Sequence, residues 1–227
     1  MRKALLFISA ALLLSSCTFV RIGSNALDGM VVGSGNTVTE TFSVAPFESI
    51  TIRFAGDVEY TPGVEDCSVA VTASDNVIKL LDIFVDDGTL VLALKDGASV
   101  TNSRIKVNAC SPSLSEVKLQ GSGDFTTTAP MVTDSFSLTI NGSGDIDIDG
   151  LECKDFALAI NGSGDAIVSN IDCESIAAAI RGSGDIRLSG KADAADISIY
   201  GSGDIDIREP ETSNLSTTKR GSGDILK

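Results

Sequence analysis

Gly142-Ser143-Gly144-Asp145 is the four-residue motif that decides the fold of this 227-residue chain. Apolar and polar residues alternate on both sides of it, along Phe136–Asn141 before the motif and Ile146–Asp149 after it. This two-residue period is that of a β-strand, whose successive side chains point to opposite faces. The motif is therefore predicted to form a corner between two short strands. Glycine, which reaches positive φ without a Cβ penalty, and serine, which is small enough to stack, suit such a corner.

The motif is repeated at a nearly constant spacing. Successive copies start 21, 20, 20, 19 and 20 residues apart, at Gly121, Gly142, Gly162, Gly182, Gly201 and Gly221. A repeat of this length indicates one supersecondary unit per repeat, which buries its apolar face on its neighbours. We therefore predict an all-β fold, a parallel β-helix (solenoid) in which each turn takes about 20 residues.

The chain before the repeats is less regular but still rich in β patterns. Residues 18–37 are expected to form a tether, residues 38–118 a β lobe that covers the first turn, and residues 119–227 the regular repeats. Ala55-Gly56-Asp57 resembles a degenerate corner, whereas Gly33-Ser34-Gly35-Asn36 lies outside the period and is not counted as one. An aspartate followed by spaced apolar residues predicts one short helix within Asp75–Phe84. Strands are predicted at Thr37–Val44, Ser68–Thr72, Thr89–Leu94 and Arg104–Ala109.

The last repeat has lysines where earlier repeats have apolar residues. Lys219 stands at the position of Ile199, and Lys227 at that of Ile207. Charged residues at inward positions are typical of a terminal turn that faces solvent, because they discourage pairing with another chain.

Residues 1–16 have the pattern of a signal peptide. Arg2 and Lys3 precede the apolar run Ala4–Leu14, and Leu14-Ser15-Ser16-Cys17 matches a lipobox. We predict that Cys17 is lipidated and anchors the protein in the outer membrane as a lipoprotein. The surface side and the periplasmic side of that membrane are both alternatives. The alternative is an ordinary secreted protein in which this cysteine has no role.

The charge balance excludes one class of partner. Without residues 1–16 the chain has 15 basic and 31 acidic residues, a net charge of −16. Such a surface repels nucleic acid, so no nucleic-acid partner is expected.

Four cysteines remain beside Cys17, and an even number in an exported chain suggests disulfides. Cys153 and Cys173 each lie 11 residues after the first glycine of a motif. They therefore occupy equivalent places on adjacent turns, within the Cα separation that a disulfide spans. We predict a Cys153–Cys173 disulfide and assign Cys67 and Cys110 to the second. No spacing among them fits a zinc site.

The aspartates of the motif form the first candidate site. Stacked turns place these carboxylates about 5 Å apart, where like charges repel by about 1 kcal/mol or less per pair in water. We expect each carboxylate to accept hydrogen bonds from the backbone of its own corner. A calcium ladder and simple exposure are the alternatives, so no cofactor other than Ca²⁺ is considered. The row is Asp124, Asp145, Asp165, Asp185, Asp204 and Asp224.

A second, polar row lies one residue before each corner. It consists of Gln120, Asn141, Asn161, Arg181, Tyr200 and Arg220. Alternation turns these side chains outward, so Asn141 and Asn161 can form an amide ladder, and Arg181 and Arg220 can pair with corner aspartates. Asn141, Asn161, Arg181 and Tyr200 together form a candidate surface for sugar hydroxyls. The alternative is a solvated sheet face.

Enzymatic activity is not expected. The chain has no histidine, and Gly-Ser-Gly does not have the spacing of a nucleophile elbow. A polysaccharide-cleaving β-helix that uses Asp145 and Asp165 is the one enzyme class retained as an alternative.

Three further segments and the repeats resemble a known family. They are Phe47-Glu48-Ser49-Ile50, Ala55-Gly56-Asp57-Val58 and Ser111-Pro112-Ser113-Leu114. Over about residues 38–227 the chain is similar to the "putative auto-transporter adhesin, head GIN domain" family, which includes exported lipoproteins of Bacteroidetes-like bacteria. The resemblance implies a right-handed β-helix and no established enzymatic activity. We therefore expect an envelope-anchored adhesion or binding protein for surface glycan or protein. The alternative is a structural envelope scaffold.

Overall fold

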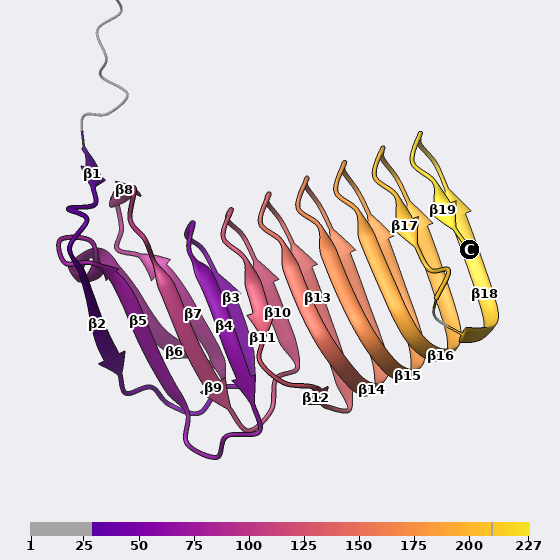
Figure 1. The fold of residues 1–227 in the computed structure, drawn as a ribbon, viewed down its shortest axis with the longest axis horizontal. Helices are drawn as coiled ribbons and strands as arrows, with labels where there is room; N and C mark the ends of the chain where they lie inside the picture. The colour runs from indigo at the N-terminus through magenta and orange to yellow at the C-terminus, as the bar shows by residue number, and fades with distance from the viewer. Residues whose placement is uncertain (1–28, 210) are drawn as a thin grey trace, which may run out of the picture.

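The computed structural model describes residues 29–209 and 211–227, which form a row of stacked β turns (Figure 1). β1, β2 and β8 lie at one end of the row, and β18 and β19 lie at the other. Within the described ranges no α-helix is found, and no helix is long and apolar enough to cross a membrane. The predicted all-β, parallel β-helix fold is confirmed.

The regular repeats stack in register. Ile146 of β14 lies beside Ala166 of β15, and Ile160 lies beside Ile180, so one turn of the solenoid takes 20 residues at this point. All neighbouring strands of this part run parallel. The strands are β10 (Glu116–Leu119), β11 (Phe125–Thr127), β12 (Met131–Val132), β13 (Ser135–Ile140), β14 (Ile146–Ile160), β15 (Ala166–Ile180), β16 (Ile186–Ile199), β17 (Ile205–Asp206), β18 (Glu211–Lys219) and β19 (Ile225–Leu226).

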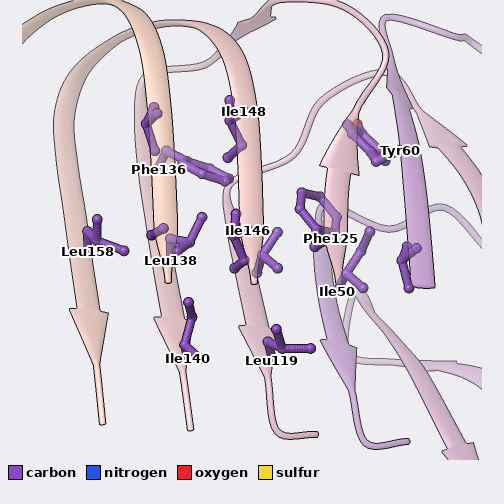
Figure 2. Close-up of a cluster of buried hydrophobic side chains, with 14 of the residues drawn as sticks. Ile50, Tyr60, Leu119, Phe125, Phe136, Leu138, Ile140, Ile146, Ile148 and Leu158 are labelled. Carbon is purple, nitrogen blue, oxygen red and sulfur yellow. The ribbon is translucent and has the colours of Figure 1, made fainter. Parts of the chain in front are cut away.

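Alternation of inward and outward side chains explains each turn. Along β14 the alternation is interrupted at Gly150–Leu151, which are both buried, and at Lys154–Asp155, which are both exposed. The strand bends at these places, so its apolar side chains keep facing the same interior. Figure 2 shows part of that interior, with Phe136 among isoleucine and leucine side chains. The rings of Phe136 and Phe156 stack with their centroids 6.0 Å apart. Such ring pairs stabilise a core by about 0.5–1.5 kcal/mol beyond the area they bury.

The N-terminal lobe continues the same solenoid. Its strands are β1 (Met30–Val32), β2 (Thr37–Phe42), β3 (Ser49–Ile52), β4 (Asp57–Pro62), β5 (Ser68–Ser74), β6 (Leu81–Asp86), β7 (Thr89–Leu94), β8 (Ser99–Thr101) and β9 (Lys106–Ser111). β3 pairs in parallel with β7 and β10, and β4 pairs in parallel with β9 and β11. The predicted degenerate corner, Ala55-Gly56-Asp57, is confirmed because Gly56 lies directly against Gly123.

Antiparallel strands close the first turn. β5 lies antiparallel to β9, β2 to β5, and β6 to β7. The parallel stacking therefore ends at β7 and β9, and the lobe covers the end of the solenoid as expected. Residues before 37 take part in this lobe, because β1 pairs with β8 and the Gly33 amide donates to Thr101 O at 2.8 Å.

The predicted helix within Asp75–Phe84 is wrong. Only a single 3-10 turn, Ile78–Leu80, lies there, and β6 follows it directly. Leu81, Ile83 and Val85 pack against the core at strand spacing. Pairing of β6 with β7 outweighs the weak helical pattern, since tertiary contacts override local propensity. Of the strand predictions, Thr89–Leu94 matches β7, while β2, β5 and β9 differ from theirs by about two residues at one or both ends.

Candidate functional site

The corners form one long edge of the solenoid, and their glycines are required by close backbone contact. A Cβ added at Gly164 would lie 2.0 Å from Gly144 O, and one at Gly184 would lie 1.9 Å from Gly164 O. Apart from Gly221, no corner glycine has a positive φ. The prediction that these glycines serve a positive φ is therefore wrong. Each turn places its corner backbone directly on the previous one, which leaves no space for a side chain.

The corner aspartates join neighbouring turns. The Oδ1 atom of Asp145 accepts a hydrogen bond from the Asp165 amide at 2.8 Å, and Asp165 Oδ1 accepts one from the Asp185 amide at 2.7 Å. The same contact recurs along the row from Asp124 to Asp224, and Asp57 begins it with a longer one of 3.4 Å. The prediction that the carboxylates accept hydrogen bonds from backbone amides is confirmed. The amides belong to the next turn, however, and not to the same corner. At the corner the regular backbone hydrogen bonds between parallel strands are interrupted. There the aspartate carboxylate accepts the amide hydrogen bond that a backbone carbonyl accepts elsewhere in the sheet.

This aspartate ladder offers no clear cation site. Among residues 29–209 and 211–227, no group of three or more acidic or cysteine side chains is arranged to hold a metal ion. The Oδ1 atoms from Asp57 to Asp204 are already used by backbone amides. The calcium alternative therefore gains no support from the geometry.

The ladder makes a direct prediction for Asp165. Asp165→Ala removes the acceptor of the Asp185 amide and is expected to lower the free energy of unfolding by about 1 kcal/mol, as loss of a capping side chain does. Asp165→Asn keeps an oxygen acceptor and removes the repulsion from Asp145 and Asp185, so its loss is expected to be less than half as large. Urea unfolding of both variants measures this difference. Equal losses would show that the carboxylate does not act through this hydrogen bond.

The polar row lies beside the ladder, and its members are all exposed. Asn161 Nδ2 donates to Asn141 Oδ1 at 2.9 Å, which confirms the amide ladder. Arg181 lies over the ring of Tyr200, with its Cζ atom 5.6 Å from the ring centroid. The suggested ion pairs of Arg181 and Arg220 with corner aspartates are wrong. Of the described corner aspartates, only Asp224 forms an ion pair, and its partner is Lys219.

We call the three adjacent rows of this edge the corner ridge. It comprises the polar row, the corner serines Ser122, Ser143, Ser163, Ser183, Ser202 and Ser222, and the aspartate ladder. Parallel neighbours repeat about every 4.7–4.9 Å, so the corner ridge presents a serine hydroxyl and an aspartate carboxylate at each turn, beside a polar-row side chain that varies from amide to guanidinium to phenol. The structure also adds Arg53 to the polar row, because the next residue, Phe54, lies against Gly121 and so takes the place of a first corner glycine. The sequence signal for it was its place directly before Phe54-Ala55-Gly56-Asp57.

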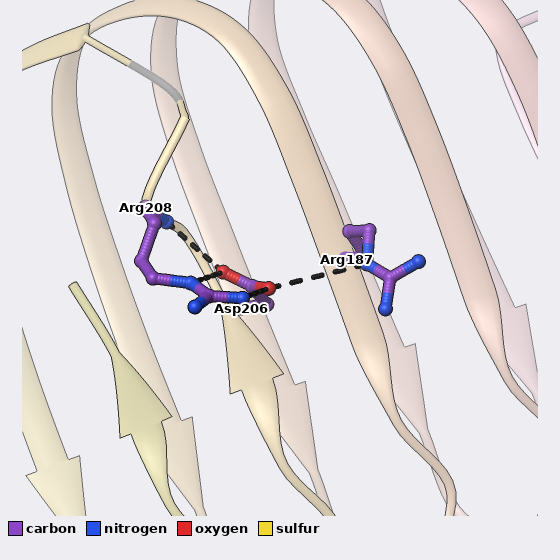
Figure 3. A network of polar contacts seen from close by, with 3 residues as sticks. All are labelled: Arg187, Asp206 and Arg208. Carbon is purple, nitrogen blue, oxygen red and sulfur yellow. Dashed lines mark hydrogen bonds and ion pairs between the residues drawn. The ribbon is translucent and has the colours of Figure 1, made fainter.

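A second cluster, which the sequence did not indicate, lies just after the corners. Arg208 donates two side-chain hydrogen bonds to Asp206, from Nε to Oδ1 at 3.0 Å and from Nη2 to Oδ2 at 2.6 Å. Arg187 approaches the same carboxylate through Nε at 4.0 Å (Figure 3). The hydrogen bond from Arg208 lowers the pKa of Asp206 to about 2. Asp206 is thus charged at any physiological pH, and its contact with Arg208 weakens only as the pH falls through about 2.

These arginines line a shallow groove that we call the arginine groove. It has a volume of about 320 Å³ and lies beside the aspartate ladder. Its side chains come from β15, β16, β17, β19 and the adjoining corners. They include Asp165, Ile167, Asp185, Arg187, Asp204, Asp206, Arg208 and Leu226. Sequence analysis missed Arg187, Asp206 and Arg208 because they do not repeat from turn to turn.

The cysteines lie partly as predicted, but no disulfide is present among the described residues. Cys153 and Cys173 are in-register neighbours on β14 and β15, and both are buried free thiols. The adjacent Cys173 thiol, together with burial, raises the pKa of Cys153, and the Cys153 thiol lowers the pKa of Cys173. In the second pair, Cys110 lies opposite Ser68 and not opposite Cys67. The strand register therefore brings Cys153 and Cys173 together for a disulfide, but not Cys67 and Cys110.

We predict that Cys153 and Cys173 form a disulfide in an oxidising environment. Under oxidising conditions Cys153→Ser should then lower the free energy of unfolding by about 2 kcal/mol through loss of a cross-link. With dithiothreitol present, this variant and the parent chain should differ much less. Thermal unfolding with and without the reductant measures both, and Cys110→Ser is the matched control. An equal effect of Cys153→Ser under both conditions would contradict the cross-link.

Comparisons with known proteins agree with this geometry. The chain resembles a crystal structure of a "putative adhesin" from Parabacteroides distasonis, with 27% identity and a TM-score of 0.81 over 86% of this chain and 82% of that one. A "putative adhesin" from Bacteroides fragilis shares 23% identity and a TM-score of 0.70, over 86% and 99% of the two chains. A "putative lipid binding protein" from Parabacteroides distasonis shares 21% identity and a TM-score of 0.74, over 87% and 100%. The last two show the common fold. A search of curated proteins found no match.

The family assignment rests on most of the chain. Residues 46–169 and 151–226 match the family described as "Putative auto-transporter adhesin, head GIN domain". These ranges contain all six Gly-Ser-Gly-Asp motifs and the degenerate corner. The resemblance inferred from the sequence is therefore confirmed, and the chain belongs to the head GIN domain family of putative auto-transporter adhesins.

Proposed function

We propose that this protein is a non-enzymatic adhesion protein of the cell envelope that binds a surface glycan along the corner ridge. The observation that carries the proposal is the ridge itself, in which exposed amide, guanidinium, hydroxyl and carboxylate groups recur with the turns of the solenoid. A glycan chain also repeats its hydroxyl groups along its length, so donors and acceptors can be matched unit after unit. Tyr200, with 42% of its surface exposed, adds a ring on which a sugar can stack.

The surroundings of the ridge favour binding over catalysis. An acid and a base of a glycosidase need carboxyl groups in different environments. Asp145 and Asp165 instead have the same environment, since each accepts the amide of the next corner aspartate. Membership of an adhesin family supports the same choice.

Anchoring by Cys17 is part of the proposal, although residues 1–28 lie outside the described ranges. β1, which begins at Met30, lies at the end of the solenoid formed by the N-terminal lobe, opposite β18 and β19 (Figure 1). A lipid at Cys17 would therefore hold the protein by the lobe and leave the repeats extending from the membrane.

A glycan array tests this proposal. The purified protein is expected to be retained by one set of related glycans, and Arg181→Ala and Tyr200→Ala should each weaken retention about tenfold, the effect of losing one good polar or stacking contact. Lys191→Ala, which changes an exposed residue of β16 away from the corners, is the matched control.

Other outcomes would contradict the proposal in distinct ways. No retention by any glycan, together with no binding to intact cells, would leave a structural envelope scaffold. Release of oligosaccharides from a bound polymer, lost in Asp145→Asn and Asp165→Asn, would instead identify an enzyme.

A further inference from the structure

The arginine groove contains one guanidinium that is largely free to bind a ligand. Within the described residues, the only ion pair of Arg187 is the 4.0 Å contact of its Nε with Asp206, and its side chain is 68% exposed. Arg208, in contrast, has two short contacts with the same carboxylate. Arg208 and Asp206 therefore neutralise one another and form a fixed wall, and the terminal nitrogens of Arg187 remain available as donors (Figure 3).

The arginine groove also contains hydrogen-bond acceptors. Asp185 and Asp204 line it, and each uses Oδ1 to accept the amide of the next corner. None of the hydrogen bonds within the described residues uses their Oδ2 atoms. In-register neighbours on adjacent turns lie about 4.7–4.9 Å apart, so Asp185 and Asp204 line the groove close together, each with one carboxylate oxygen that accepts no hydrogen bond from the described residues.

Two aliphatic side chains complete the arginine groove. Ile167 is the in-register neighbour of Arg187 on β15, and Leu226 is that of Asp206 on β19. They are 37% and 38% exposed, among the few large apolar side chains that are open to solvent. The groove thus combines hydrogen-bond donors, acceptors and two exposed apolar side chains, within a volume at the lower end of the range for small-ligand sites.

The charges in the groove select the class of ligand. Four carboxylates, those of Asp165, Asp185, Asp204 and Asp206, line it beside the two guanidinium groups. An anion would be repelled by the carboxylates, and a cation would meet the exposed guanidinium of Arg187. A neutral hydroxyl can donate to a carboxylate and accept from a guanidinium at the same time.

We propose that the arginine groove binds one neutral sugar ring, whose hydroxyls donate to Asp185 and Asp204 and accept from Arg187, and whose C–H face packs on Ile167. The groove shares Asp165, Asp185 and Asp204 with the corner ridge. It is therefore the subsite that fixes the position of the longer chain. This inference rests on the proposed function only in that the ligand is a glycan.

Ligand-observed NMR tests the proposal with simple probes. Methyl glucoside, methyl galactoside and methyl mannoside are each added in millimolar amounts to the purified protein, with methyl glucuronide as the charged comparison. At least one neutral glycoside should show saturation transfer, and the glucuronide should show less. Arg187→Ala should weaken the binding about tenfold, as loss of a charged hydrogen-bond donor does. Arg187→Lys should restore part of it, and Lys191→Ala should leave it unchanged.

The result separates this inference from the proposed function. If Arg187→Ala leaves glycoside binding unchanged, or the glucuronide binds better than the neutral glycosides, the arginine groove does not act as proposed. The same holds if no glycoside binds while the protein is retained on the glycan array. Failure of both the array and the NMR experiment overturns both proposals.

Discussion

Gly164→Ala is expected to lower the free energy of unfolding by about 4 kcal/mol or more, an effect that the other inner corner glycines should share. The new Cβ would lie 2.0 Å from Gly144 O, and this neighbour is backbone that cannot rotate away. Neighbouring turns would have to separate by more than about 1 Å, because ordinary carbon contacts begin near 3.5 Å. Separation would also break the hydrogen bond between the Asp165 amide and Asp145. Chemical unfolding measures the loss.

Two control variants separate the physical causes. Gly97 has a φ of +74°, and a Cβ added there would have nothing within 4 Å, so Gly97→Ala tests backbone conformation alone. Its expected loss is about 1 kcal/mol. Ser163→Ala changes the same corner without adding an atom near the backbone and should have a smaller effect than Gly164→Ala. If Gly97→Ala and Gly164→Ala were equally destabilising, close approach of the corners would not be the reason for the motif.

Replacing the two lysines of the last turn, Lys219→Ile with Lys227→Ile, is expected to increase the mass of the protein in solution through association of its chains. Lys219 Nζ lies 2.6 Å from Asp224 Oδ1 and occupies the place that the amide of a further turn would take. Leu215 and Leu226 of the last turn are already 38% exposed. With isoleucine at both positions, the final strands would present an apolar edge with unpaired backbone groups, which favours pairing between chains.

Size-exclusion chromatography with light scattering measures this change over a range of protein concentrations. Lys191→Ile is the matched control, because it adds the same side chain on the outer surface of β16 and not at the end of the solenoid. An unchanged mass for the double variant would show that the lysines do not keep the terminal turn from associating.

The architecture of the repeats could be predicted from the sequence because two simple constraints coincide there. Alternation of residues such as Ile146, Asp147 and Ile148 requires strands, and a constant period of the corner motif requires stacking in register. The same reasoning placed Cys153 beside Cys173 and Asn141 beside Asn161. It predicted the corner and polar rows for the same reason, since every member of a row has the same place in its turn.

Residues that do not repeat could not be placed in this way. Arg187, Asp206 and Arg208 form their cluster because in-register pairing of β16 with β17 brings unlike side chains together, and no periodic signal marks them. The short 3-10 turn before β6 likewise depends on pairing with β7, which local sequence does not encode.

Alternation and the constant period are enough to predict stacked β turns, the inward-facing residues and the positions of the corners. The reason for glycine and aspartate in the motif becomes visible only in the folded chain. The glycines allow backbone to lie on backbone, and each aspartate accepts an amide from the next turn. The physical reason is that both contacts join residues about 20 positions apart, and their geometry exists only when the turns are stacked.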